Sequence, residues 1–242
     1  MARGRVWAVA GRNGRGAPTA VTLFLGLYLT TLAKAGADAQ NRIFPLGIGV
    51  DARAYWGYLV ALSVALQVLV LPFIGALADY TGRKRLLVAA FAYPGAIATM
   101  AMFNLQGRDD RAGGALFLLA NVAFGASIAV YNSFRPDISS VEDRDRVSSK
   151  GWGIGHLRGG SLLVLNLLLY RYAQALHLDE GTAVRISLGS AGVWWAVFTV
   201  IPLRALRDRP SRLTMAPGQR LLSAAFNRSS TRCANSPSSL RR

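Results

Sequence analysis

The stretch PFIGALADYTGRKRLL, residues 72–87, leaves a long apolar run, carries a single aspartate, and then sets three basic residues together at 83–85. On either side of it, residues 54–78 and 86–107 contain no Asp, Glu, Lys or Arg. A helix rises about 1.5 Å per residue, so about 20 residues cross a hydrocarbon core about 30 Å thick. The stretch is therefore predicted to be a short basic turn between two membrane-spanning helices.

Similar runs recur along the 242-residue chain. Five runs of at least 18 residues have no charged side chain, and a sixth has Arg158 alone: 16–33, 54–78, 86–107, 112–134, 186–203 and 151–170. Buried helices of soluble proteins seldom run so far without a charge. The pattern predicts an all-α membrane protein with six transmembrane helices over residues 18–203.

Lys and Arg are unevenly divided between the predicted loops. If every run crosses the membrane, the side that holds both termini has 20 of the 28 basic residues and the opposite side has 7. Without the 9 in the C-terminal tail, the ratio is still 11 to 7. Because cytoplasmic loops carry the excess of Lys and Arg, both termini are predicted to be cytoplasmic. The net charge of +16 is explained by this orientation, and we expect no nucleic-acid partner.

The two ends of the chain differ in composition from the apolar middle. Residues 1–17 are rich in Arg and Gly and residues 204–242 in Arg and Ser, which predicts basic, disordered segments. Arginines of the tail are an alternative binding site for anionic lipid headgroups. The N-terminus also fits a signal peptide cleaved near Ala35 or Ala37, which would leave five spans. The long apolar run favours a retained first span.

Residue types that serve catalysis or metal binding are sparse. Cys233 is the only cysteine, and His156 and His177 are far apart, so neither a disulfide framework nor a zinc site is expected. No phosphate-binding loop, dinucleotide fingerprint or nucleophile elbow is present. The sequence predicts no enzyme, no cofactor and no metal.

The basic turn has a pattern more specific than its charge. The segment GALADYTGRKR, residues 75–85, resembles the cytoplasmic signature between the second and third helices of the major facilitator superfamily. The matching positions are Gly75, Asp79, Gly82, Arg83 and Lys84, and Tyr80 stands where the pattern has a basic residue. The resemblance implies a conformational gate, in which charge contacts of this turn hold one face closed and then break. On physical grounds, Gly75 allows close helix approach and Gly82 a tight chain reversal.

A second stretch, VYNSFRPDISSVEDRDRVSSKGWGIGHLRGGSLLVLN at 130–166, narrows the family. It resembles the fourth-to-fifth helix region of the vacuolar amino-acid effluxer (autophagy-related) family and its bacterial relatives, and the resemblance covers about residues 18–205. This implies a secondary transporter of a small polar solute, such as an amino acid. The family has about twelve spans, so the chain resembles its N-terminal six-helix half. Residues 10–18, AGRNGRGAP, depart from the family pattern, and both ends fit a truncation or a shifted reading frame.

Candidate pathway residues lie on the fourth and fifth predicted spans. Asn121 and Asn132 share one face of a helix with Gly125 and Ile128. Polar groups in a span face the bundle or a water-filled cavity, so the two asparagines either bind neighbouring helices or line a pathway. Arg158 either extends toward the cytoplasmic interface or holds an anion such as a carboxylate. Four glycines of the fifth span predict close helix packing: Gly151, Gly155, Gly159 and Gly160.

The predicted partners follow from this assignment. They are the lipid bilayer, a small-molecule solute, and either a second six-helix half or a second copy of this chain as a homodimer. A multi-pass location in a bacterial cell membrane is favoured over a vacuolar membrane. Because one half supplies one wall of the expected cavity, the alternative is a non-transporting integral membrane protein, or remnant, that acts only through interactions.

Overall fold

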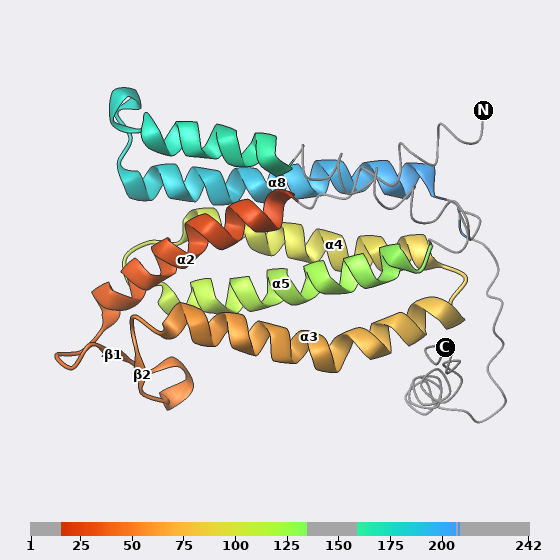
Figure 1. The fold of residues 1–242 in the computed structure, drawn as a ribbon, viewed down its shortest axis with the longest axis horizontal. Coiled ribbons are helices and arrows are strands. Elements are labelled where there is room, and N and C mark those ends of the chain that lie inside the picture. Colours follow the sequence, from red (N-terminus) through yellow and green to blue (C-terminus); the bar gives the residue numbers. More distant parts are fainter. Residues whose placement is uncertain (1–15, 135–158, 207, 209–242) are drawn as a thin grey trace, which may run out of the picture.

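The computed structural model describes residues 16–134, 159–206 and 208 (Figure 1). Long helices lie side by side in this part of the chain. They are α2 (Gly16–Gly36), α3 (Tyr55–Tyr80), α4 (Lys84–Ala101), α5 (Asp110–Asn132), the helix Gly159–Arg171 and α8 (Glu180–Ala205). Short 3-10 turns lie at η1 (Pro45–Gly47), η2 (Met102–Asn104) and η3 (Gln174–Leu176). The protein is thus mostly helical, as predicted.

Four of the described helices are long and apolar enough to cross a membrane. They are Tyr55–Tyr80, Lys84–Asn104, Asp110–Asn132 and Glu180–Ala205, with mean hydropathies between 1.6 and 2.3 over their most apolar windows. Helix α2 and the helix Gly159–Arg171 occupy the positions of the first and fifth predicted spans. The coarse assignment to an integral membrane protein is confirmed, whereas the count of six spans stays a prediction.

Helix α4 lies between α5 and α8, and α3 packs on the far side of α5 (Figure 1). Helices α3 and α4, although joined by a three-residue link, therefore barely touch each other. Helix α2 crosses α8 and α5. The approach of α4 to α8 is close at Gly192, where an added Cβ would lie 2.6 Å from the Met100 backbone nitrogen and 2.8 Å from the Ala96 oxygen. Small side chains let these two helices pack tightly.

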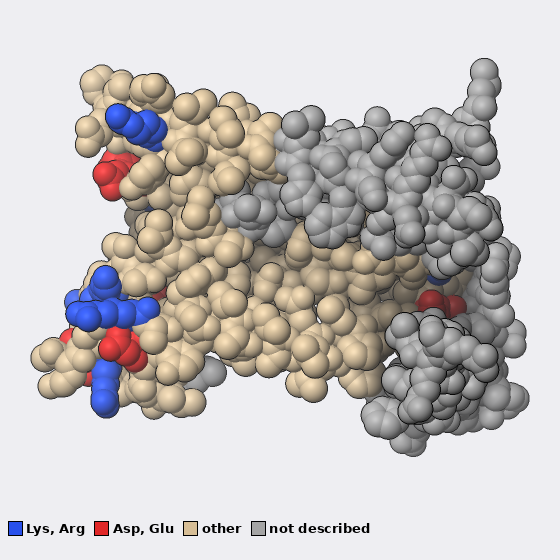
Figure 2. Space-filling view, viewed as in Figure 1, with Lys and Arg blue, Asp and Glu red and all other residues tan. Residues whose placement is uncertain are grey.

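Two apolar clusters hold the bundle together. The larger one joins α2, α4, α5 and α8 around fully buried Leu29, Met102 and Leu188. The smaller one, around Val130 and Phe134, lies at the end that carries the α3–α4 link. Many large apolar side chains remain exposed, and in Figure 2 charges gather beyond a broad uncharged middle. Lipid is the natural cover for such a belt.

The loop between α2 and α3 corrects the all-α prediction in one detail. Strand β1 (Arg42–Ile43) pairs antiparallel with strand β2 (Val50–Asp51), and η1 lies between them. Ile43 and Val50 face each other in this pairing, and two β-branched residues separated by a Pro- and Gly-containing turn favour a hairpin. The segment falls between the first two uncharged runs, and its strands were not predicted from the sequence.

Candidate transport pathway and gate

The predicted gate lies where α3 gives way to α4. Helix α3 ends at Tyr80, α4 begins at Lys84, and residues 81–83 make the whole link. The amide of Thr81 donates to the Leu77 carbonyl at 3.0 Å, so the chain leaves α3 directly into an extended residue. Among the described glycines, positive φ occurs at Gly47 and Gly107 and not at Gly82. The reversal therefore proceeds without the left-handed conformation that would make glycine necessary.

Lys84 is held by the end of α5. Its Nζ donates a hydrogen bond of 3.0 Å to the carbonyl oxygen of Ser133, and it lies 5.5 Å from the ring centroid of Phe134. Ser133 is the C-terminal cap of α5, where the helix dipole places partial negative charge. The lysine thus ties the α3–α4 link to a helix that follows it in the chain.

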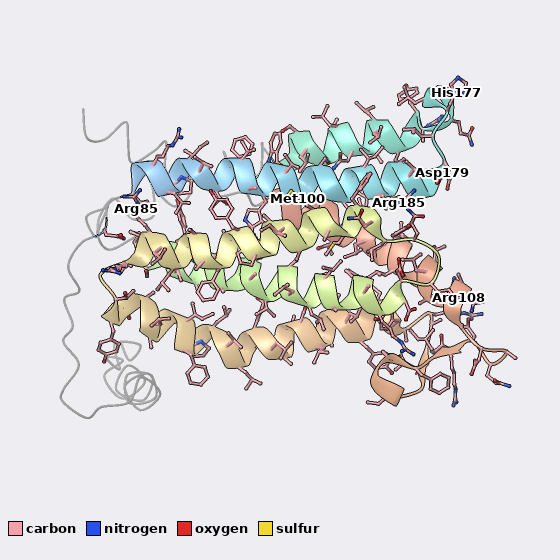
Figure 3. The ribbon with its side chains drawn as sticks, turned by 180° about the vertical axis from the view of Figure 1, so that it is seen from behind. Arg85, Met100, Arg108, His177, Asp179 and Arg185 are labelled. Atoms are coloured by element: carbon pink, nitrogen blue, oxygen red, sulfur yellow. The ribbon has the colours of Figure 1, made fainter. Side chains whose placement is uncertain are left out.

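Arg85 makes a second tie at the same end. Its backbone N–H donates to Asp208 Oδ1 at 2.9 Å, so the start of α4 meets the segment after α8. Asp208 falls within the predicted disordered tail, which otherwise lies almost wholly outside the described residues. The buried Nε of Arg85 has no hydrogen-bond partner within the described part of the chain. Figure 3 shows Arg85 at one end of the bundle, opposite Arg108, His177 and Asp179.

The remaining gate residues differ in exposure. Asp79 is partly buried in the last turn of α3, and Arg83 is exposed. Around Gly75, no described heavy atom comes within 4 Å of the position that a Cβ would occupy. Close helix approach at Gly75 is therefore not made by the described helices, and the gating roles of Gly75, Asp79 and Arg83 stay predictions.

Asn121 lies halfway along α5 and bonds to α3. Its Nδ2 donates to Ser63 Oγ at 2.8 Å, and the Ser63 hydroxyl donates to the Val60 carbonyl at 2.8 Å. Ser63 is fully buried, whereas Asn121 is only partly buried. Helix–helix bonding, one of the two roles predicted for Asn121, is thus present. Its incomplete burial leaves part of the carboxamide available to a second contact.

Gln67 is a candidate that sequence analysis missed. It lies on the same seam, because a Cβ added at Gly125 of α5 would collide with the Gln67 Oε1 atom. Gln67 is partly buried and central in α3, with 12 residues of the helix before it and 13 after it. A carboxamide in the middle of an apolar run is the signal that could have revealed it.

Asn132, the other predicted pathway residue, lies far from this level. It lies eleven positions after Asn121, which corresponds to about 16 Å along the helix. Its Oδ1 atom is buried and has no hydrogen-bond partner among the described residues. The structure therefore does not bring the two asparagines together.

The fifth predicted span is described only in part. Arg158, Gly151 and Gly155 lie outside the described residues, as does His156. Gly159 is buried, but no described heavy atom lies within 4 Å of a Cβ position at Gly160. The predicted packing role of these glycines stays open.

A second missed residue, Asn166, joins the helix Gly159–Arg171 to α8. It is 4% exposed, its Nδ2 donates to the Ser187 carbonyl at 3.4 Å, and its Oδ1 accepts from Ser190 Oγ at 3.1 Å. With both ends of the carboxamide engaged inside the protein, Asn166 fixes one helix against another.

The start of α8 has a compact polar chain. Arg185 Nη2 donates to Thr182 Oγ1 at 2.7 Å, and Thr182 in turn donates its hydroxyl and its amide to the N-cap residue Asp179 at 2.6 and 2.8 Å. These hydrogen bonds, the hydroxyl's first, hold the pKa of the Asp179 carboxyl below its usual range. No cluster of three potential metal ligands occurs among the described residues. The group serves to begin the helix.

Comparisons with known proteins agree with the predicted family. A family model described as vacuole effluxer Atg22 like matches residues 9–238. The chain is 22% identical over 184 residues to the uncharacterized MFS-type transporter YxiO of Bacillus subtilis, covering 75% of this chain and 41% of that protein. It is 25% identical over 249 residues to autophagy-related protein 22-2 of Neosartorya fischeri, covering 76% and 41%. No solved structure matches the chain.

These matches confirm the resemblance carried by the basic turn and by residues 130–166. The family is one of transporters of the major facilitator type, which agrees with the prediction that the chain is not an enzyme. The chain spans about two fifths of the length of the curated relatives it matches.

Proposed function

Because the chain belongs to the vacuole effluxer Atg22-like family, we propose that it is one half of a secondary transporter that moves a small polar solute, such as an amino acid. The observation that carries the proposal is the position of two carboxamides. Asn121 has eleven residues of α5 on either side, and Gln67 is equally central in α3. Both are polar, at mid-depth, and incompletely buried.

Mid-depth carboxamides are costly against lipid, because hydrocarbon cannot satisfy their hydrogen bonds. The face of α3 and α5 that carries them is therefore expected to meet protein or a water-filled pathway. Transporters of this type bind their solutes near the bilayer midplane, between two halves. A carboxamide both donates and accepts hydrogen bonds, so this pair suits a solute with amino and carboxyl groups.

The middle parts of four described helices carry no charged side chain, which bears on how a solute would be bound there. Residues 56–78, 86–101, 112–132 and 186–203, all of them described, include no Asp, Glu, Lys or Arg. These four helices would therefore contribute neutral hydrogen bonding at mid-depth. A coupling carboxylate, if the transporter uses one, would come from the other half.

The arrangement of the loops supports the proposed topology of six spans with both termini in the cytoplasm. The α2–α3 hairpin, the α4–α5 link and the turn before α8 lie at one end, and the basic α3–α4 link lies at the other (Figure 1). The excess of Lys and Arg on the latter side favours the cytoplasm. We place the protein in a bacterial cell membrane. Its partner is a second six-helix half or a second copy inserted in the same orientation.

The test is solute efflux from proteoliposomes containing the chain, alone and together with the remaining length of a curated relative. Replacing Gln67 and Asn121 by leucine removes both carboxamides at similar volume and should abolish efflux in whichever arm supports it. Thr99→Val is the matched control, because among the described residues the Thr99 hydroxyl bonds only to the Gly95 carbonyl of its own helix, at 2.8 Å. Full efflux by the double variant would refute the proposed pathway.

Crosslinking in membranes separates the two partners. A dimer of the chain that transports alone supports the homodimer, and transport only with a second half supports the two-chain form. A protein that transports in neither arm but captures other membrane proteins would instead fit the non-transporting alternative.

A further inference from the structure

The hairpin between α2 and α3 exposes apolar side chains that the bundle does not cover. Phe44 is 45% exposed and Ile48 is 67% exposed. Their neighbours on the other face, Ile43 and Ala52, are 4% and 0% exposed and belong to the main apolar cluster. One side of the hairpin is therefore fastened to the protein, while the other presents an aromatic and an aliphatic side chain outward.

Hydrogen bonds fix this shape. Asp38 Oδ1 accepts from the amides of Gln40 at 3.0 Å and Arg42 at 2.7 Å. Asp51 Oδ1 accepts from the Arg53 amide at 2.7 Å and from Asn41 Nδ2 at 3.2 Å. These carboxylates brace both strands, so the outward direction of the apolar face is built into the hairpin.

The turn at its tip keeps the two exposed side chains apart from the core. Gly47 has φ of +81°, a left-handed conformation that favours glycine. The Phe44 ring lies over Gly49, where a Cβ would be 3.2 Å from the ring carbon Cε1. A side chain at either glycine would disturb the placement of the apolar face.

The hairpin lies beside the bundle at the end that carries the α4–α5 link (Figure 1). In Figure 1, η1 lies next to the first turns of α3, on the side away from α5 and α4. Tyr58, in the first turn of α3, is 62% exposed, and Tyr172, five residues before His177 at this end of the bundle (Figure 3), is 58% exposed. Exposed aromatic residues of this kind mark the headgroup level of a membrane protein. Phe44 and Ile48, which flank η1, therefore lie at the expected level of the headgroups.

We propose that the Phe44–Ile48 face inserts into the boundary between headgroups and acyl chains of the adjacent leaflet and anchors this end of the half. Arg42 and Arg53 are exposed on the same hairpin, where they can meet lipid phosphates. Aromatic and aliphatic groups flanked by arginine suit that boundary. The anchor is the same whichever side of the membrane holds the hairpin, and it does not depend on transport.

The experiment places spin labels in vesicles of phosphatidylethanolamine and phosphatidylglycerol. The single native cysteine is removed by Cys233→Ser. Labels are then attached at Phe44→Cys, at Ile48→Cys and, as the control on the same hairpin, at the exposed Gln40→Cys. Collision with oxygen and with a water-soluble nickel chelate gives the depth of each label. The labels at 44 and 48 should respond to oxygen several-fold more strongly, relative to nickel, than the label at 40.

A second arm guards against an effect of the label itself. The label at 48 is measured again in a Phe44→Asp background, where it should move toward the water response. Water-like responses at all three positions would overturn the proposal. Protection of 44 and 48 from both reagents would also overturn it, because protein and not lipid would then cover the face. Neither outcome bears on transport, so failure here is distinct from failure of the proposed function.

Discussion

The ammonium of Lys84 lies 3.0 Å from the carbonyl oxygen of Ser133, a residue 49 positions later in the chain. The basic turn is therefore engaged by a helix of its own chain. Its neighbour Arg83 is exposed, whereas Lys84 and Arg85 are partly buried. We therefore assign Lys84 to stabilising the bundle, and Arg83 to contacts at its surface.

Removing the Lys84 charge should loosen the end of the bundle that carries the α3–α4 link. Lys84→Met is expected to lower the free energy of unfolding by about 1 kcal/mol, the usual worth of a cation at a helix C-terminus in partly buried surroundings. Lys84→Arg should retain most of this stability, and Arg83→Met should have little effect. Thermal unfolding in detergent, followed by loss of the monodisperse peak, measures all three. Equal effects of the Lys84→Met and Arg83→Met changes would contradict the assignment.

The hydrogen bond from Asn121 to Ser63 should appear as an interaction energy. A double-mutant cycle with Asn121→Leu and Ser63→Ala is expected to give a coupling of about 0.6 kcal/mol, the average for side-chain hydrogen bonds inside membrane proteins. Stability in mixed detergent and denaturant provides the four values. A cycle of Asn121→Leu with Thr99→Val serves as the control and should give no coupling.

Gly192 should tolerate no large side chain. Gly192→Leu would force α4 away from α8, because Met100 and Ala96 backbone atoms occupy the space, and we expect a loss of about 1–3 kcal/mol. Gly75→Leu is the matched control, since the described residues leave its Cβ position open. The leucine at 75 should be neutral in the isolated chain, as measured by unfolding. If Gly75 meets a second half, the same change should weaken co-purification with that half.

Lowering the pH should destabilise the first turn of α8. Because the folded pKa of Asp179 is lowered by its bonds to Thr182, its stabilising effect is present above the unfolded pKa and is lost as pH falls through the folded pKa. Amide exchange near Thr182, measured by mass spectrometry over a descending pH series and corrected for intrinsic rates, should rise in that range. Asp179→Asn retains an acceptor without titrating and should remove the pH dependence. An unchanged profile in that variant would exclude the carboxyl as its source.

Helix positions were largely predictable because uncharged runs are a direct consequence of the hydrocarbon core. The uncharged run 186–203 lacks the first six residues of α8, which begins at Glu180 after the cap residue Asp179. Polar and charged residues at a helix terminus lie outside the apolar run, so a prediction from hydropathy alone makes the helix too short. The predicted span 55–78 likewise stops two residues short of Tyr80.

Partners across the bundle were not predictable in the same way. The sequence around Gln67 does not predict its contact with Gly125, and the sequence around Lys84 does not predict its bond to Ser133. Both contacts depend on which helices become neighbours in the fold. Asn166 gave a signal, a carboxamide within an apolar run, but not its serine partners. The hairpin was hidden for another reason: strands of two residues carry too little alternation to recognise.

The position of α5 between α3 and α4 has a consequence for the order of assembly. Helices α3 and α4 leave the ribosome as consecutive segments on a three-residue link, yet they barely touch. Ser63 and Gln67 of α3 find their counterparts on α5, which is synthesised after α4. Helices α3 and α4 are therefore both synthesised before the helix that covers the polar seam of α3, and in the finished bundle α5 lies between them. The bundle is therefore completed when α5 packs between α3 and α4, and not by adding each helix beside the one before it.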